Sequence, residues 1–388
     1  MKKLLIATAA LAMVAGTAQA QSSVTIYGIL STGYESVKLD VDGATLKQTT
    51  TGREGAQAGS RLGFRGTEDL GGGTTAGFTL EMGAGMTSGL GAVRVGFMDL
   101  GNKQLGTVRA GRVDSLTRQV VNTYTSHANS GFEPGNTATS MGRISSMLAS
   151  TITTASSPAL TTAEAALVAG QAADLANLSW GQAAGRTSNT IGYISPSMNG
   201  FQFQAQIGQV SSDNSLATGE QDVQDTQAFG VSYNAGKLSV MAATSTEKTT
   251  AAETGGVLAR PAGNTKNKTD ILGATYDFGV AKAFAMYTDR TLTRTGSTTT
   301  ASFGNYAVDQ KDTTIGVTVP VGAKVVLVGS YSMGDIKIGG DSVDLDGYQL
   351  QANYNFSKRT KAYVMYGESK LDSALKMNGY VAGVQHSF

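Results

Sequence analysis

Apolar and polar side chains alternate along much of the chain after position 20. In the stretch FQFQAQIGQ, Phe201, Phe203 and Ile207 share one face of an extended chain, and the glutamines between them share the other. The stretches 228–234 (AFGVSYN) and 348–356 (YQLQANYNF) repeat this pattern. A two-residue period with one apolar face predicts half-buried β-strands. The other face is rich in glutamine, asparagine, serine and glycine, which suits a wet interior.

Turn residues divide this pattern into regular segments. Short turns alternate with longer loops along almost the whole chain, which is typical of an outer-membrane barrel, and an even strand count returns both ends to the same side. We expect sixteen strands near 24–34, 57–68, 74–84, 91–100, 106–113, 188–195, 200–210, 226–234, 237–246, 268–278, 280–290, 310–319, 323–333, 344–356, 360–370 and 378–388.

The alternative to a membrane barrel is a soluble β-sandwich, whose strands would show the same alternation. Aromatic residues near predicted strand ends favour the membrane, because such residues form girdles at both interfaces of a barrel; examples are Tyr34, Tyr193, Phe278 and Tyr366. After Ala20 no run of 18 apolar residues appears, which excludes a helical membrane protein. The predicted fold class is therefore all-β, a 16-stranded antiparallel transmembrane β-barrel.

Such a barrel has to close. A backbone group left unpaired in hydrocarbon costs several kcal/mol, so an open edge would be prohibitive. The strand that begins at Val24 should therefore pair with the strand that ends at Phe388. Sixteen strands enclose a lumen too wide for side chains to fill, which predicts an aqueous channel.

The first twenty residues have the features of a secretory signal peptide. Lys2 and Lys3 give a basic start, Leu4–Ala15 is apolar, and Ala18–Ala20 is a small-residue cleavage site. The apolar run is too short to span a bilayer. We expect residues 1–20 to be removed and residues 21–388 to form the barrel.

Charge and cysteine usage narrow the possible partners. Loss of the two leader lysines lowers the basic count from 30 to 28, against 29 acidic residues. A net charge near −1 argues against nucleic acid as a partner. The chain has no cysteine, so an exported barrel would hold its fold without disulfides.

One long segment interrupts the strands. Between Gly111 and Arg186 the alternation stops for about seventy residues, and loops beyond about 12–15 residues are usually functional or disordered. We expect a constriction loop at about 113–187 that folds into the barrel mouth. Part of it, Met141–Gly185, is rich in alanine, serine and threonine, with a possible capping box at Thr161–Glu164 and a short helix over Ala165–Leu178. That helix would narrow the channel or cover the mouth.

Five stretches carry a family resemblance. They are SVTIYGILSTGY (Ser23–Tyr34), SRLGFRGTEDLGGGTTAGFTLE (Ser60–Glu81), LGTVRAGR (Leu105–Arg112), GRTSNTIGYISPSMNGFQF (Gly185–Phe203) and YVAGVQHSF (Tyr380–Phe388). In this order they resemble the trimeric general porins of β-proteobacteria and neisseriae. The segment Met141–Gly185 departs from that family, being longer than usual.

The resemblance implies a set of pore residues. In this family the third outer loop folds inward, and arginines on the wall face acidic groups on the loop. The wall arginines that match by motif are Arg61, Arg112 and Arg186; Arg65 shares the strand parity of Arg61, and Arg109 is a further candidate. The acidic candidates are Asp114, which begins the loop, and Glu133 in GFEPGN.

The position of Arg112 depends on where its strand ends. Strict alternation would place Arg112 on the face of Val108 and Ala110, unless the strand stops there. An arginine that faces lipid at the bilayer midplane costs roughly 2–4 kcal/mol, which disfavours an outward position.

The function implied is passive diffusion of small hydrophilic solutes and ions through an outer-membrane channel, with weak anion preference. The resemblance also implies a homotrimer, contact with outer-membrane lipid and lipopolysaccharide, and assembly by the barrel-assembly machinery with Phe388 as terminal signal. We expect no enzymatic reaction, cofactor or metal; Ca²⁺ among rim carboxylates has no support in residue spacing.

Other functions remain open from sequence alone. A substrate-specific channel for sugars or organic acids would need an aromatic track in the lumen, for which Tyr27 and Tyr363 are the inward candidates. A barrel-based enzyme would need a placed base and nucleophile. This chain has two histidines: His127 lies in the long loop, and His386 lies on the outward face predicted for the last strand. An adhesin or transporter β-domain would need a passenger or plug domain, which we do not expect after Ala20.

Overall fold

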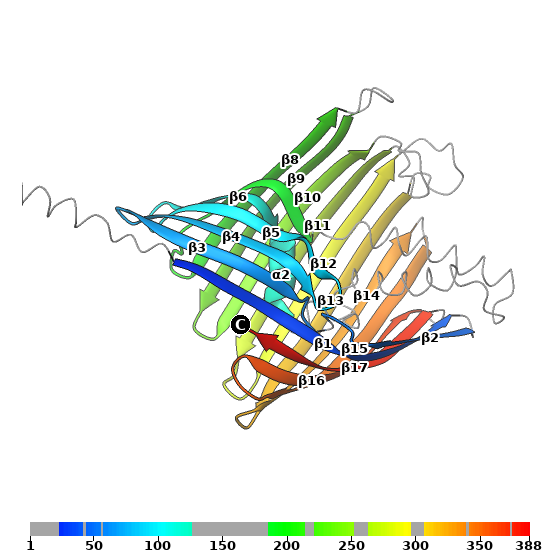
Figure 1. The fold of residues 1–388 in the computed structure, drawn as a ribbon. Coiled ribbons are helices and arrows are strands. Elements are labelled where there is room, and N and C mark those ends of the chain that lie inside the picture. Colours follow the sequence, from blue (N-terminus) through cyan, green and yellow to red (C-terminus); the bar gives the residue numbers. More distant parts are fainter. Residues whose placement is uncertain are drawn as a thin grey trace, which may run out of the picture.

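The structure is a computed structural model, and it describes residues 23–41, 44–55, 57–125, 185–213, 221–251, 263–295, 306–338, 341–372 and 375–388. These residues form one antiparallel sheet closed into a barrel (Figure 1). Its strands are β1 (Ser23–Val41), β2 (Ala44–Thr51), β3 (Arg61–Gly71), β4 (Thr74–Gly85), β5 (Gly89–Asn102), β6 (Gly106–Asp114), β7 (Arg186–Ile194), β8 (Phe201–Asp213), β9 (Gln221–Ala235), β10 (Leu238–Ala251), β11 (Gly263–Asp277), β12 (Lys282–Thr295), β13 (Tyr306–Val321), β14 (Val325–Ile338), β15 (Asp341–Asn355), β16 (Thr360–Leu371) and β17 (Leu375–Ser387).

The seventeen strands occupy sixteen positions around the barrel. Strands β2 and β3 share one position, because both pair with β1: β3 lies along residues 23–29, and β2 along residues 34–41. The predicted fold class is therefore confirmed. In the described residues, no helix is long and apolar enough to cross a membrane.

The first and last strands close the barrel, as the sequence predicts. Residues 29–41 of β1 pair with β17, which lies beside β1 in Figure 1. At the end of the seam the Gly28 N–H donates to the Phe388 carbonyl, and the Phe388 N–H donates to the Gly28 carbonyl, both at 3.1 Å. No free edge is left between them.

The hairpin formed by β1 and β2 is a correction to the predicted strands. The predicted first strand ends at Tyr34, whereas β1 continues to Val41 and pairs with β2, a segment expected to be loop. The physical reason is a second period-two pattern, in which Val37 and Leu39 are buried and alternate with the exposed or half-buried Lys38 and Asp40.

The two faces of the sheet differ as predicted. The apolar residues of the alternating stretches are exposed on the outer face, with Phe203 at 50% and Leu350 at 56% exposure. Their polar neighbours Gln206 and Gln349 face inward and are buried. The aromatic residues predicted for the girdles are also exposed: Tyr34, Tyr193, Phe278 and Tyr366. This inversion of ordinary burial is what a barrel in lipid requires.

A single described helix, α2 (Leu116–Tyr124), lies inside the barrel (Figure 1). Ser115 caps its start, with Oγ accepting from the Arg118 N–H at 3.1 Å. One stripe of the helix packs on the inner faces of β9–β12; the buried cluster contains Leu116, Val120 and Tyr124 from the helix and Ala228, Met241, Ala243, Ile271 and Met286 from the wall. The start of the predicted constriction loop is thus held against the wall.

The Tyr124 ring fits against the wall because the residue beneath it, Gly273, has no side chain. A Cβ at Gly273 would lie 2.6 Å from two ring carbons of Tyr124. The Tyr124 hydroxyl also shares a 2.9 Å hydrogen bond with Ser239 Oγ. The last turn of α2 therefore depends on this one position in β11.

We expect Gly273→Ala to displace α2 from the wall. Overpacking of this kind costs about 1–3 kcal/mol, so the apparent midpoint of thermal unfolding in detergent, followed by circular dichroism, should fall. Gly329→Ala is the matched control, because its Cβ would meet only Leu350 at an ordinary 3.4 Å. Addition of Tyr124→Ala should remove most of the effect of Gly273→Ala. Equal midpoints for the two alanine variants would contradict the proposed contact.

Candidate functional site

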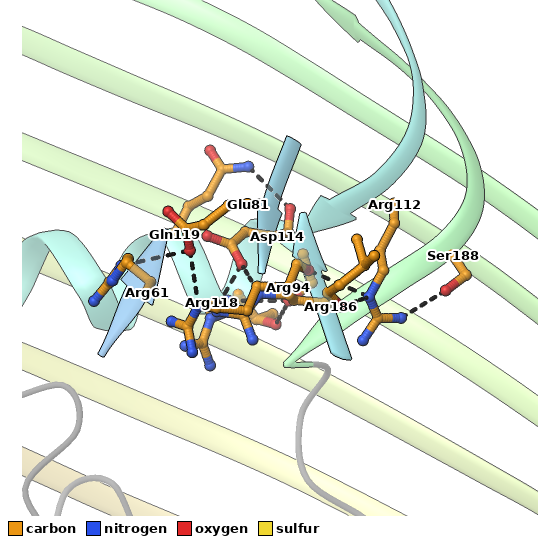
Figure 2. Close-up of polar contacts among 12 residues, drawn as sticks. Arg61, Glu81, Arg94, Arg112, Asp114, Arg118, Gln119, Arg186 and Ser188 are labelled. Carbon is orange, nitrogen blue, oxygen red and sulfur yellow. Dashed lines mark hydrogen bonds and ion pairs between the residues drawn. The ribbon is translucent and has the colours of Figure 1, made fainter. Parts of the chain in front are cut away.

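A cluster of charged side chains projects from the inner wall beside α2 (Figure 2). It comprises four arginines and two carboxylates, from different elements: Arg61 from β3, Glu81 from β4, Arg94 from β5, Asp114 from β6, Arg118 from α2 and Arg186 from β7. We call this set the arginine cluster. Neighbouring strands of an antiparallel sheet place inward side chains at the same level, and a β-bulge in β5 and the helix α2 add Arg94 and Arg118 to them.

Glu81 organises one half of the arginine cluster. It is almost fully buried, and its Oε1 accepts a hydrogen bond from Arg94 Nε at 2.7 Å. Arg61 Nη1 lies 3.7 Å from the same oxygen. Tyr27 donates its hydroxyl to Oε2 at 3.3 Å. Both oxygens of this inward carboxylate are therefore engaged.

Arg94 reaches Glu81 because of a β-bulge. Alternation in β5 would put Arg94 on the face of Met98, which is 67% exposed on the outer wall. Between β4 and β5 the register shifts at Glu81, so that Glu81 pairs with Val95 and Met82 pairs with Val93. Arg94 is the extra residue, and the bulge turns its side chain inward.

Asp114 organises the other half. Its Oδ1 lies 3.2 Å from Arg118 Nε and 3.0 Å from Arg186 Nε. Its backbone carbonyl accepts from Gln119 Nε2 at 3.3 Å and from Gln206 Nε2 at 3.1 Å. Asp114 thus joins the end of β6 to the first turn of α2, to β7 and to β8.

The two halves act as one charged site. The charge of Arg186 interacts with those of Arg94, Arg118, Asp114 and Glu81, so the halves lie within electrostatic range, and Figure 2 shows the side chains gathered together. Four guanidinium groups face two carboxylates, which leaves an excess of two positive charges. Because these side chains are only partly exposed, water screens the excess less than at an open surface.

The structure brings together three of the residues predicted for the pore: Arg61, Asp114 and Arg186. Arg65 lies beside them, with its guanidinium 5.3 Å from the ring centroid of Tyr27. Glu133 and His127, together with the predicted helix Ala165–Leu178, lie outside the described residues.

Two predicted arginines lie outside the cluster. Arg109 pairs with Asp99 through two hydrogen bonds of 2.7 and 2.8 Å, and its guanidinium lies 3.9 Å from the Phe97 ring centroid. Arg112 pairs in register with Gly96, and its side chain donates to the carbonyls of Val93 and Arg94 and, at 2.6 Å, to Ser188 Oγ (Figure 2). Its bonds therefore link β6 to both of its neighbours, β5 and β7.

The two tyrosines considered for an aromatic track have other partners. The Tyr27 hydroxyl bonds Glu81, and the buried Tyr363 hydroxyl shares a 3.0 Å hydrogen bond with Ser31 Oγ. Among the described residues, no group of three or more histidine, aspartate or glutamate side chains is placed to hold a metal ion.

Sequence reasoning missed Glu81, Arg94 and Arg118. Glu81 sits in a motif quoted for the resemblance, but nothing marked its role. Strand alternation predicts that Arg94 faces lipid, so it was not a pore candidate. The free-energy cost of an arginine in lipid was nevertheless a signal that a bulge turns this side chain inward. Arg118 follows Asp114 by four residues, the spacing of a helical ion pair, and Ser115 between them is a helix cap.

The geometry defines a class of protein: a closed membrane barrel whose lumen carries a positive cluster beside an inward helix. The sequence profile of the Gram-negative porin family matches residues 7–374. The chain belongs to this family, and it is an outer-membrane porin.

Individual relatives agree with this assignment. Outer membrane porin protein 32 of Delftia acidovorans is 31% identical over 99% of this chain and 95% of its own length. An outer membrane porin protein of Bordetella pertussis is 29% identical over the whole of both chains. Among solved structures, an anion-selective porin from Comamonas acidovorans is similar with a TM-score of 0.65 and 23% identity, covering 95% of this chain and all of that one.

Glu81→Gln should increase the preference of the channel for anions. The substitution removes one negative charge and leaves Arg61 and Arg94 without their carboxylate, so the positive excess of the cluster rises by one. The measurement is the reversal potential in a planar bilayer under a KCl gradient.

Asp99→Asn provides a control for Glu81→Gln. It makes the same charge change on the inner wall, but Asp99 pairs with Arg109 outside the cluster. An equal shift of the reversal potential in both variants would contradict a specific role of Glu81 in ion selectivity.

Proposed function

We propose that this porin passes small hydrophilic solutes by passive diffusion and prefers anions, and that the arginine cluster sets this preference. The observation that carries the proposal is the excess of positive charge at one level of the lumen, where α2 lies inside the barrel. Low-dielectric walls focus the field of such a cluster on the aqueous path. The porin from Comamonas acidovorans that shares the fold is described as anion-selective, which supports the proposal.

The mechanism is electrostatic and involves no bond making. An anion that enters from either side loses part of its hydration in the narrow region and gains attraction to Arg61, Arg94, Arg118 and Arg186. The carboxylates of Glu81 and Asp114 compensate part of the guanidinium charge and limit how tightly the anion is held. Binding must stay weak enough for the ion to leave, so a partly compensated cluster suits conduction better than four free arginines.

We propose further features that the family resemblance implies. The segment at about 113–187 forms the constriction loop, of which α2 is the described start. Residues 1–20 are a cleaved signal peptide. The protein is a homotrimer, associates with outer-membrane lipid and lipopolysaccharide, and is inserted by the barrel-assembly machinery. It carries out no enzymatic reaction and needs no cofactor.

Neutralising a cluster arginine should reduce anion preference. A unit charge 4 Å from an ion is worth about 1 kcal/mol in water, so Arg186→Gln or Arg94→Gln should lower the chloride-to-potassium permeability ratio by up to about fivefold. Reversal potentials in a KCl gradient measure this ratio, and closures in groups of three would report the trimer.

Arg112→Gln is the matched control for that series. Arg112 loses the same charge on a neighbouring strand, but it is held by Ser188 and by backbone carbonyls rather than by the cluster carboxylates. A cation-selective wild type, or an Arg112→Gln effect as large as that of Arg186→Gln, would contradict the proposed role of the cluster.

Deletion of Phe388 should reduce the yield of folded trimer. The residue supplies both hydrogen bonds at the end of the closing seam, and we propose that it is the terminal assembly signal. Folded and unfolded barrels differ in gel mobility before and after heating, which gives the measurement. Phe278→Ala removes another exposed aromatic side chain, at the short turn after β11, and should leave the yield unchanged. Normal yield of the truncated protein would contradict this assignment.

A further inference from the structure

A short segment between β2 and β3 is held at both ends by one residue of β1. The Gly55 N–H donates to the Ser31 carbonyl at 3.0 Å. Ser60, just before β3, bonds the same residue, because its Oγ accepts from the Ser31 N–H at 3.1 Å. Ser31 is fully buried on the inward face of β1, so the segment starts and ends at the inner wall. We call residues 53–55 and 57–60 the inner ledge.

The tip of the inner ledge reaches a distant strand. Gln57 Nε2 donates to Asn353 Oδ1 at 2.8 Å. Asn353 is buried on the inward face of β15, where it also accepts from Gln351 Nε2 at 2.7 Å. Strands β16 and β17 lie between β15 and β1, so the contact spans three strand spacings, roughly 14 Å along the wall. The ledge therefore passes over the inner faces of β16 and β17, inside the lumen.

Charged side chains fix the base of the inner ledge. Arg53 Nε lies 3.3 Å from Oε1 of Glu35, a buried residue of β1. Glu54 Oε1 accepts from the Thr87 N–H at 2.8 Å and from Thr87 Oγ1 at 3.1 Å. Thr87 lies in the turn between β4 and β5. The ledge is thus bound to three separate parts of the wall, and its position in the lumen is defined by side chains as well as by its ends.

The inner ledge also contacts the arginine cluster. Arg61 Nε donates to the Gly59 carbonyl at 2.9 Å, which adds a second partner to the Glu81 carboxylate for this arginine. A Cβ at position 59 would lie 3.1 Å from Arg94 Nη1. Gly55, whose φ is 68°, packs against Gly59, since a Cβ there would lie 3.2 Å from the Gly59 Cα. Glycine at both positions lets the ledge turn beside two guanidinium groups.

Two inward elements therefore flank the arginine cluster. Helix α2 lies on β9–β12, and the inner ledge lies on β1 and β15–β17. The cluster strands β3–β7 lie between these two parts of the wall in the closed barrel.

We propose that the inner ledge is a second constriction element of the channel and that Gln57 is a residue that determines its size limit. The arginine cluster selects the sign of the solute charge, and the ledge limits the cross-section beside it. Small anions pass, and bulkier organic anions of the same charge are excluded. The inference rests on the proposed function, because it concerns which anions the channel admits.

Single-channel recording with a thiol reagent tests the position of the inner ledge. The chain has no cysteine, so Ala58→Cys introduces one reactive site next to Gln57, at a half-buried position. Modification with 2-sulfonatoethyl methanethiosulfonate adds a negative charge and bulk. It should reduce the conductance and lower the chloride-to-potassium permeability ratio by up to about fivefold.

Ala235→Cys is the matched control for Ala58→Cys. Ala235 is exposed at the end of β9, on the outward parity of Tyr233. Intact mass should show complete modification of both variants, and the conductance of Ala235→Cys should not change. Unchanged conductance of fully modified Ala58→Cys would overturn the placement of the ledge in the ion path.

Substitution of the amide pair tests the size limit. Gln57→Ala and Asn353→Ala each remove the bond that holds the tip of the ledge. Each should raise the gluconate-to-chloride permeability ratio, measured as a bi-ionic reversal potential, by roughly twofold or more, the size expected for one lost hydrogen bond. The double variant should show no larger effect than either single change, because both remove the same contact.

Gln351→Ala is the control for the amide pair. It removes the other hydrogen bond to Asn353 and leaves the ledge contact in place, so the gluconate-to-chloride ratio should stay unchanged. Heat-dependent gel mobility confirms that each variant is folded. An unchanged ratio in Gln57→Ala, or an equal rise in Gln351→Ala, would overturn the role of the ledge. The chloride-to-potassium ratio of the unaltered protein tests the arginine cluster instead, so the two proposals can fail separately.

Discussion

Every backbone N–H and C=O of a membrane sheet has to find a partner in the sheet itself, because hydrocarbon offers none. This constraint explains the seam at which β1 meets β17, and it explains why β1 carries two strands, β2 and β3, along its other edge. Once the barrel is closed, register is fixed around the whole circumference. Alternation then decides which residue faces water and which faces lipid, and a one-residue slip would exchange the two sets.

The charged site depends on local exceptions to that alternation. A regular strand places only every second residue in the lumen, so neighbouring strands supply a limited charge at any one level. The bulge in β5 adds Arg94 to the inward set, and a second register shift between Gly111 and Val113 precedes Asp114. Bulges are common beside functional sites because they re-aim side chains without breaking the sheet. Here they concentrate guanidinium groups where α2 begins.

The limits of sequence reasoning follow from the same physics. Period-two patterns identified most strands, the closing seam and the lipid face. Family motifs led to Arg61 and Arg186, and Asp114 was a candidate because it begins the long loop. Both kinds of signal missed residues whose side-chain direction differs from the direction that strand alternation predicts. Arg94 has lipid parity and an inward side chain, and Arg118 sits in a helix within a segment read as loop. The hairpin of β1 and β2 also has a signal in the sequence. Asp42-Gly43 is a favoured turn dipeptide, and residues on both sides of it alternate, although the segment is predicted above as a loop.

Selectivity in such a channel is a local property. The whole chain carries a formal charge of +1, while the arginine cluster alone has an excess of two. Glu81 and Asp114 do more than reduce that excess. Without them, four guanidinium groups at one level would repel one another and turn away from the lumen, since opposite charges fix their directions at distances of 2.7 to 3.7 Å. The carboxylates thus hold the arginines in a fixed arrangement, and under the proposed function the remaining charge acts on a passing anion.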